Sequence, residues 1–149
     1  MARVVGFKKL EAVFRKSAGL DLDKSKADRI ISIIEKKFHD LLLVAVEKCS
    51  YNGRDIIMEP DLPITKGFEE SMRQFRELEE VVELSDILEF LKKIPPLKYP
   101  LSADLEEKLP EYIGALMLIV ARVLKEVGAG RKPSTEDIDK AERILDLTL

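Results

Sequence analysis

The sequence predicts an all-α protein built from two copies of one unit, each containing a short helix, a long helix and a second short helix. Apolar residues recur at helical spacing along most of the 149 residues, and no long stretch alternates like a half-buried strand. A second observation is an internal repeat at an offset of 77 residues, which aligns Leu41–Leu43 with Leu118–Val120 and Gly53-Arg54 with Gly130-Arg131. We therefore expect one unit over residues 1–76 and another over residues 77–149, packed together as one compact domain.

The first unit begins with an apolar stripe between Phe7 and Phe14, which predicts a short helix from about residue 7 to 18 that ends at Gly19. A long helix is predicted from about residue 25 to 52, and it is apolar around much of its circumference. Its candidate N-caps are Asp21, Asp23 and Ser25. After a loop with a brief extended piece, a third helix is expected to begin with Asp61 as its N-cap.

The second unit repeats this order with changes. Ser85 is the expected cap of a short helix that reaches about residue 94. Ser102 opens a long helix to about residue 127, and Pro110 should kink that helix or delay its regular part. Ser134 and Asp137 have the spacing of a capping box at the start of the last helix.

Charge is distributed unevenly between the units. Residues 1–76 carry 15 basic and 12 acidic side chains (+3), whereas residues 77–149 carry 10 and 16 (−6), which gives the net charge of −3. An acidic total argues against strong, indiscriminate binding to nucleic acid but leaves room for a local basic ridge. The linker Glu77–Glu83 is acidic and lacks Gly and Pro, which favours a stiff, helical connection.

Composition also limits the possible disulfides, membrane spans and cellular location of the protein. A single cysteine, Cys49, excludes an intramolecular disulfide. The longest strongly apolar run, Ile113–Ala121, is too short to span a bilayer, and the N-terminus does not resemble a signal peptide. A cytoplasmic protein without membrane contact is expected. The 36% of charged residues, rich in Lys and Glu, resembles the usage of thermophilic proteins.

Several segments resemble histones. Gly53–Asp61 is similar to the second loop of archaeal histones, Lys16–Gly19 to the end of their first helix, and Ser25–Ala27 to the start of their second. The second copy has Gly130–Lys132 followed by Thr135–Ile138, one residue shorter. Together, roughly residues 7–75 and 85–148 resemble the bacterial histone-fold doublets of the DUF1931 type. This resemblance implies a duplicated histone fold that forms an intramolecular pseudo-dimer.

The same resemblance implies a non-enzymatic, histone-like architectural protein, nucleoid-associated, that binds the backbone of double-stranded DNA without sequence specificity. Histone dimers contact the duplex at their paired first helices and at two pairs of loops. The corresponding candidate DNA-binding residues are Lys8, Lys9, Arg15, Lys16, Lys92 and Lys93 for the helices, Lys24, Lys26, Arg131 and Lys132 for one loop pair, and Arg54 with Lys98 for the other.

Histone folds also pair an Arg of the second loop with the Asp that opens the third helix. The resemblance therefore implies two structural clamps, Arg54 with Asp61 and Arg131 with Asp137. The chain departs from archaeal histones at Asp55, where those proteins place a Lys. Because a carboxylate beside a phosphate position is repulsive, we expect weaker DNA binding than that of an archaeal histone.

Two other classes of function compete with this one. The chain could serve as a protein-interaction or assembly module that does not bind DNA, in which case the acidic linker would suit a basic partner. For an enzyme, Glu35 and His39 are four residues apart on a helix, but no second such pair completes a metal site, and Cys49 has no nucleophile motif. We expect no catalytic residue, no metal, no cofactor and no small-molecule substrate.

Overall fold

The structure is a computed structural model that describes residues 2–149. Within these residues the secondary structure consists of helices and one isolated β-bridge, so the prediction of an all-α protein is confirmed. In chain order the elements are α1 (Phe7–Ala18), α2 (Lys24–Tyr51), the short 3-10 helix η1 (Glu59–Asp61), α3 (Lys66–Glu77), α4 (Leu84–Leu91), α5 (Ala103–Glu126) and α6 (Thr135–Thr148). In this part of the chain no helix combines the length and the apolarity that crossing a membrane requires.

Most helix ends follow the local signals in the sequence. Gly19 ends α1 in the left-handed region, with φ 64°, a conformation that glycine adopts without a steric penalty. The carboxylate of Asp23 accepts a hydrogen bond from the backbone N–H of Lys26 and so caps α2. Ser102 caps α5 in the same way, and Ser134 opens α6 with the expected capping box.

Three predicted boundaries are wrong. The cap of α3 is Thr65, because Asp61 belongs to η1 and its carboxylate is engaged elsewhere. Ser85 lies inside α4, which begins after Glu83. The linker between α3 and α4 is not helical, since Glu79 turns the chain with φ 58°.

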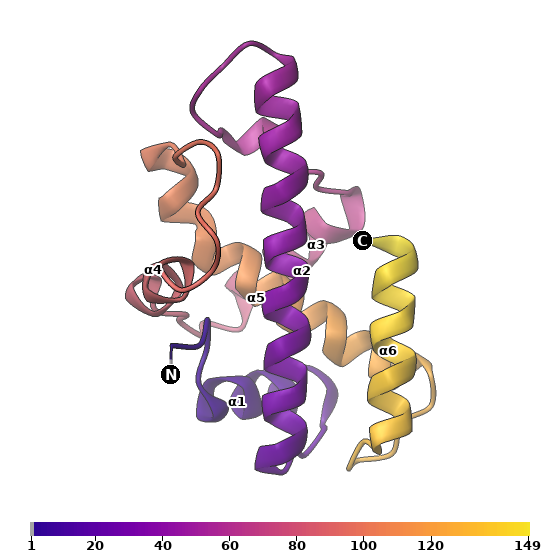
Figure 1. The fold of residues 1–149 in the computed structure, drawn as a ribbon. Helices are drawn as coiled ribbons and strands as arrows, with labels where there is room; N and C mark the ends of the chain where they lie inside the picture. Colours follow the sequence, from indigo (N-terminus) through magenta and orange to yellow (C-terminus); the bar gives the residue numbers. More distant parts are fainter. Residues whose placement is uncertain (1) are drawn as a thin grey trace.

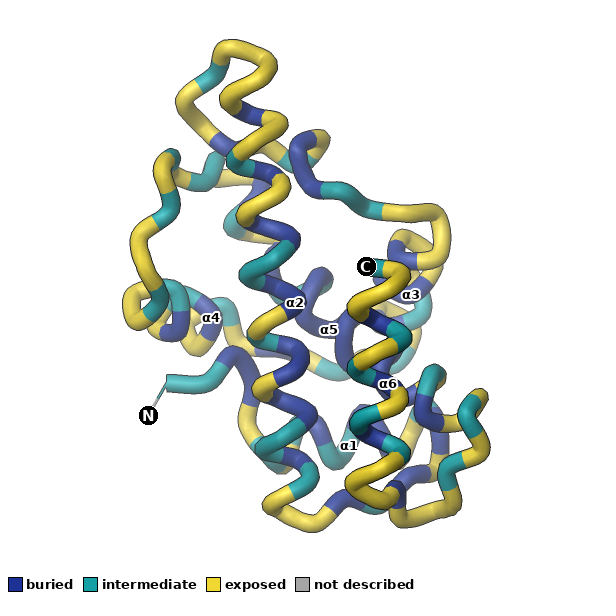
Figure 2. Tube along the Cα trace, turned by 45° about the vertical axis from the view of Figure 1, so that its right-hand side comes forward, coloured by how far each residue is buried: buried dark blue, intermediate teal, exposed yellow. Residues whose placement is uncertain are grey.

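Helix α5 lies at the centre of the molecule and packs against all five other α-helices. Figure 1 shows it crossing behind α2, and Figure 2 shows the buried residues gathered where the two long helices meet. Residues 112–118 are buried without interruption, so α5 has no solvent face along this stretch. Pro110 lies inside the helix, whose axis changes direction in its first half (Figure 1), as expected where proline removes an intrahelical hydrogen bond.

Helix α3 approaches α5 closely because residue 114 is a glycine. A Cβ atom on Gly114 would lie 2.3 Å from Cδ2 of the Phe75 ring. The ring therefore occupies the space that any other residue at position 114 would need. This contact fixes α3 on α5.

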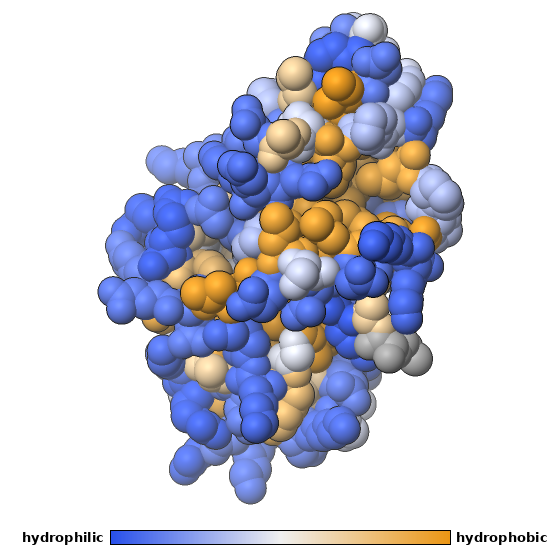
Figure 3. Space-filling model, turned by 90° about the vertical axis from the view of Figure 1, so that its left-hand side faces the viewer, coloured by the Kyte–Doolittle hydropathy of each residue, from blue (hydrophilic) through white to orange (hydrophobic). Residues whose placement is uncertain are grey.

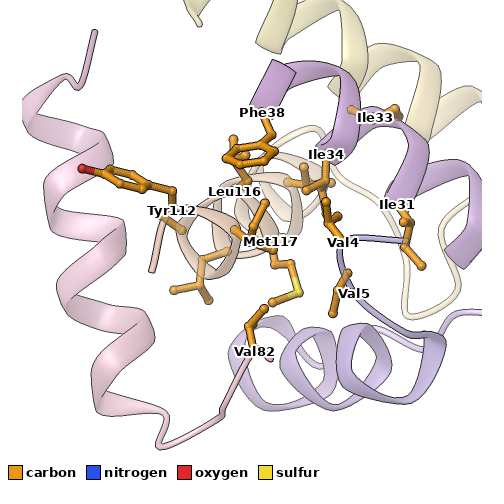
Figure 4. Packing of buried hydrophobic residues seen from close by; sticks show 14 of the residues in the cluster. Val4, Val5, Ile31, Ile33, Ile34, Phe38, Val82, Tyr112, Leu116 and Met117 are labelled. Atoms are coloured by element: carbon orange, nitrogen blue, oxygen red, sulfur yellow. The ribbon is translucent and has the colours of Figure 1, made fainter. Parts of the chain in front are cut away.

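Helix α2 is buried on one side. Figure 4 shows Ile34 and Phe38 of α2 directed toward Leu116 of α5, with Val4 of the N-terminal segment beside them. On the outer side, Leu43 is 46% exposed. Helix α6 covers part of α2, where the buried ammonium of Lys37 forms an ion pair with Asp146 and holds the pKa of that carboxyl below its usual value.

Candidate nucleic-acid interface

The first pair of loops lies at the N-terminal end of α2 (Figure 1). The backbone N–H of Asp21 donates a 2.7 Å hydrogen bond to the carbonyl of Arg131, which joins the α1–α2 loop to the α5–α6 loop. Lys26 and Lys132 line a shallow hollow of about 240 Å³ at this junction, together with Asp21 and Asp23. The cations that the resemblance places at this end are therefore brought together, but two carboxylates lie among them.

Asp21 holds the two arginines at this end. Nε of Arg131 lies 2.6 Å from its carboxylate, and Nε of Arg15 lies 3.5 Å away. The hydrogen bond from Arg131, followed by the charges of both guanidinium groups, lowers the pKa of Asp21 below its ordinary value. Since Arg131 is 79% exposed, this is a surface ion pair that a competing anion can displace.

The expected clamp between Arg131 and Asp137 is not formed, and this prediction is wrong. Asp137 instead accepts a hydrogen bond from the backbone N–H of Ser134 at 2.9 Å and completes the capping box of α6. The loop before α6 is one residue shorter than its counterpart in the first unit, so its Asp falls within the first turn of the helix. The carboxylate is then committed to the helix N-terminus, and Arg131 turns to Asp21.

The second pair of loops lies at the C-terminal end of α2. Ile57 and Leu101 form a parallel β-bridge, in which Ile57 N–H donates to the carbonyl of Pro100 and Ser102 N–H donates to the carbonyl of Ile57, both at 2.9 Å. Lys98 belongs to the same loop, and its ammonium lies 5.3 Å from the ring centroid of Tyr99. The bridge brings the loop that contains Arg54 next to the loop that contains Lys98.

The expected clamp between Arg54 and Asp61 is confirmed. Two nitrogens of the guanidinium donate to the two carboxylate oxygens, at 2.7 and 2.5 Å. Asp61 is buried, accepts a further hydrogen bond from the N–H of Met58, and has a lowered pKa, chiefly because of the hydrogen bonds from Arg54. The buried thiol of Cys49 donates to the carbonyl of Arg54, so the loop is also attached to α2. Arg54 therefore has a structural role.

The first-helix surface contains an acidic residue that sequence reasoning did not place there. Nζ of Lys9 lies 2.9 Å from Oε1 of Glu80, and Nζ of Lys16 lies 2.5 Å from Oε2 of the same carboxylate. The only signal in the sequence is the acidic linker, whose charge by itself suggests an external basic partner. Lys16 and Glu80 are more than 60 residues apart in the sequence, so no local sequence pattern predicts their contact.

The remaining candidate cations differ in whether they have an ion-pair partner. Lys26 lies 3.9 Å from Asp23, and Lys92 lies 3.2 Å from Glu89. Among residues 2–149, five of the candidates have no ion-pair partner, and they are distributed over the first-helix surface and both loop pairs. These are Lys8, Lys24, Lys93, Lys98 and Lys132.

Two of the candidates for an enzyme site, Glu35 and Cys49, are engaged in hydrogen bonds that hold neighbouring segments on α2. Glu35 accepts hydrogen bonds from Arg3 Nε and from the N–H of Val4, both at 3.1 Å, and so attaches the N-terminal segment to α2. His39 is half-buried on the same helix. Across residues 2–149, no group of three or more His, Cys, Asp and Glu side chains has an arrangement suited to a metal ion.

An apolar groove lies beside the second loop pair. Figure 3 shows apolar side chains across the middle of the face that carries α4. The groove has a volume of about 550 Å³ and is formed by α4 and the loop after it. Its apolar lining is Leu88, Leu91, Ile94, Leu97, Tyr99 and Leu101.

Comparison with known proteins identifies the family. The model of the family described as a domain of unknown function, DUF1931, matches residues 10–146, so the chain belongs to this family. An uncharacterized protein of Aquifex aeolicus (strain VF5) is 32% identical over 98% of this chain and 85% of its own length. A second uncharacterized protein of the same organism is 33% identical over 91% of this chain and 87% of its own length.

Solved structures share the arrangement of the helices. A crystal structure of a protein from Thermus thermophilus has a TM-score of 0.94 at 42% identity and covers 98% of this chain and 99% of its own. A crystal structure of an Aquifex aeolicus protein has a TM-score of 0.83 at 32% identity and covers 100% of this chain and 99% of its own. The fold described above is therefore similar to experimental structures along nearly its whole length.

Proposed function

We propose that the chain is a duplicated histone fold, closed into an intramolecular pseudo-dimer, that acts as an architectural DNA-binding protein. The order of short, long and short helices, repeated at the 77-residue offset, supports this assignment. The loop contacts support it further, since the first loop of each unit is bonded to the second loop of the other, through Asp21 with Arg131 and through Ile57 with Leu101. The Arg54–Asp61 clamp is a third feature in its favour.

The observation that carries the DNA proposal is the position of the candidate cations, which lie at α1 and the end of α4 and at the loop pairs at the two ends of α2. At the N-terminal end of α2, Lys26, Arg131 and Lys132 are brought together. Backbone phosphates are recognised by such cations without any base contact. Each of these three places retains at least one lysine without an ion-pair partner among residues 2–149, for example Lys24, Lys93 and Lys98. Each place also contains a carboxylate, so the proposed binding is weak and sensitive to salt.

The test is fluorescence anisotropy with a random-sequence DNA duplex across a salt series. We expect log affinity to fall linearly with log salt, with a slope of roughly −0.9 for each phosphate contacted. A variant with Lys24, Lys93, Lys98 and Lys132 changed to Ala should bind more weakly and with a shallower slope. Changing Lys66 and Lys125, which are exposed outside these three places, is the matched control and should alter the affinity little. Absence of binding at low salt would contradict the proposal.

A second candidate function is a protein-assembly module, and the apolar groove beside α4 favours it. Half-buried leucine and isoleucine side chains line an open groove there, which is typical of surfaces that bind other proteins. If DNA is not bound, substitution of Leu91 or Leu97 by Asp should abolish association with a protein partner captured by the wild-type chain. Association that survives both substitutions would contradict this candidate.

A further inference from the structure

The two lysines of α1 that contact Glu80 form a built arrangement for one anion. Lys9 and Lys16 are seven residues apart, so they lie on the same stripe of the helix. Both ammonium groups converge on one carboxylate, at 2.9 and 2.5 Å, with one oxygen accepting from each. The Glu80 side chain is only 13% exposed, whereas Lys16 is 51% exposed, so the carboxylate is held between the lysines and the body of the protein.

The backbone conformation of the linker places the Glu80 carboxylate next to α1. Helix α3 ends at Glu77, and Glu79 then adopts a left-handed conformation with φ 58°, which is unfavourable for a residue with a side chain. Three residues later, Val82 is buried in the core. The turn at Glu79 and the anchor at Val82 fix Glu80 between them, so its position does not depend on the two lysines alone.

Neither Arg76 nor Glu83 forms an ion pair with Lys9 or Lys16 within residues 2–149. Arg76 is engaged with Glu111, and Glu83 is exposed at the end of the linker with no ion-pair partner among residues 2–149. The two hydrogen bonds from Lys16 and Lys9 lower the pKa of Glu80, so the carboxylate is ionised at neutral pH. A second anion that approached these lysines would therefore meet a full negative charge already in place.

We infer that Lys9 and Lys16 form a single-anion site whose resident occupant is the chain's own Glu80, and whose exchangeable ligand is a phosphate of the DNA backbone. The inference rests on the proposed function and specifies how two of the cations of α1 are controlled. A carboxylate and a phosphodiester both present oxygens that accept charge-assisted hydrogen bonds from lysine. Glu80 thus limits DNA binding at the first-helix surface by occupying the place of a phosphate.

Glu80→Gln tests this inference, with Glu83→Gln as the matched control in the same linker. We expect Glu80→Gln to tighten the binding of a random-sequence duplex by about tenfold at low salt and to steepen the salt slope by roughly 0.9, as for one added phosphate. Glu83→Gln should leave both quantities near the wild-type values. In a variant that combines Glu80→Gln with Lys9→Ala and Lys16→Ala, the gain should vanish. Equal affinities of the two Gln variants at every salt concentration would overturn the inference for DNA.

A second measurement separates this inference from the proposed function. Inorganic phosphate is titrated into wild type and Glu80→Gln while the side-chain NMR signals of Lys9 and Lys16 are followed. Saturable shifts in Glu80→Gln but not in wild type, without DNA binding by either, would support the anion site and refute the DNA function. If neither DNA nor phosphate changes these signals, both the anion site and the proposed DNA-binding function are refuted. If inorganic phosphate saturates the site but duplex DNA does not compete for it, the ligand is a free phosphate and the backbone assignment is overturned.

Discussion

The long helices α2 and α5 correspond to each other at the 77-residue offset but lie in different environments. Helix α5 is buried on all sides over residues 112–118, whereas α2 exposes one side, including Leu43. The difference extends to single positions, because the residue that corresponds to Gly114 of α5 is Lys37 of α2. The two long helices thus differ in role: α5 forms the centre of the core, and α2 covers it while presenting one side to solvent.

The largest effect is expected where α5 is packed most tightly. Gly114→Ala should lower the free energy of unfolding by about 3 kcal/mol, because the new Cβ would overlap the Phe75 ring and overpacking forces the neighbours to move. Gly67→Ala in α3 is the matched control, since its Cβ would meet only Thr65 Oγ1, at 4.0 Å, and alanine favours a helix. Urea denaturation measures both variants. If Gly114→Ala is as stable as Gly67→Ala, the described contact of α3 with α5 is wrong.

A second pair of substitutions compares positions of α2 and α5 that the 77-residue offset aligns. Val120 of α5 is 1% exposed and Leu43 of α2 is 46% exposed, although the repeat aligns them. Val120→Ala should cost about 2 kcal/mol through the lost burial and the cavity left behind. Leu43→Ala removes more atoms but should cost about 0.5 kcal/mol or less, because the side chain is largely in water already. Equal losses in denaturant unfolding would contradict the asymmetry between the two helices.

A smaller difference in stability is expected between substitutions of Arg54, in the loop after α2, and Arg131, in the loop after α5. Arg54→Ala should lower Tm by several degrees, because it leaves the buried carboxylate of Asp61 without its bidentate partner. Arg131→Ala should change Tm little, since that side chain is 79% exposed. Thermal unfolding followed by circular dichroism compares the two variants directly. Two equal decreases would indicate that the second loop is also clamped.

The stability that the Arg54–Asp61 pair contributes depends on pH, and the sign of this dependence follows from the lowered pKa of Asp61. A carboxyl with a depressed folded-state pKa stabilises the fold above its unfolded pKa, near 3.8, and this contribution is lost as the pH falls through the lower folded value. Wild type should therefore lose stability on acidification below about pH 4. Asp61→Asn should show a shallower loss over the same range. An unchanged acid profile would mean that the clamp does not contribute through ionised Asp61.

Local signals in the sequence predicted most of the helices, because apolar periodicity and capping residues act within a few positions of chain. Gly19, Ser102 and Ser134 end or begin helices as expected. The predicted start of α3 is wrong because Asp61 has the side chain of a helix cap but forms an ion pair with Arg54 instead. At the candidate interface, the sequence placed the cations but not their partners.

Those partners are set by tertiary contacts that no period reveals. Glu80 reaches Lys16 across 64 positions of chain, and Asp21 reaches Arg131 across 110. Both carboxylates lie in irregular segments, where neither helical spacing nor a turn motif fixes the direction of a side chain. The sequence alone therefore does not predict which of the candidate cations have an ion-pair partner; the three-dimensional structure is needed for that.

The short linker from Leu78 to Glu83 joins the helices on its two sides in one chain, and this has a consequence for substitutions at positions that the 77-residue offset aligns. In a symmetric assembly of identical subunits, every substitution is introduced twice, once on each side of the axis. Here residue 114 is a glycine beneath Phe75 while its counterpart, residue 37, is a lysine paired with an aspartate. Because both positions lie in one chain, a substitution at one leaves the other unchanged, and the linker holds the segments on its two sides at a high effective concentration that dilution cannot reduce.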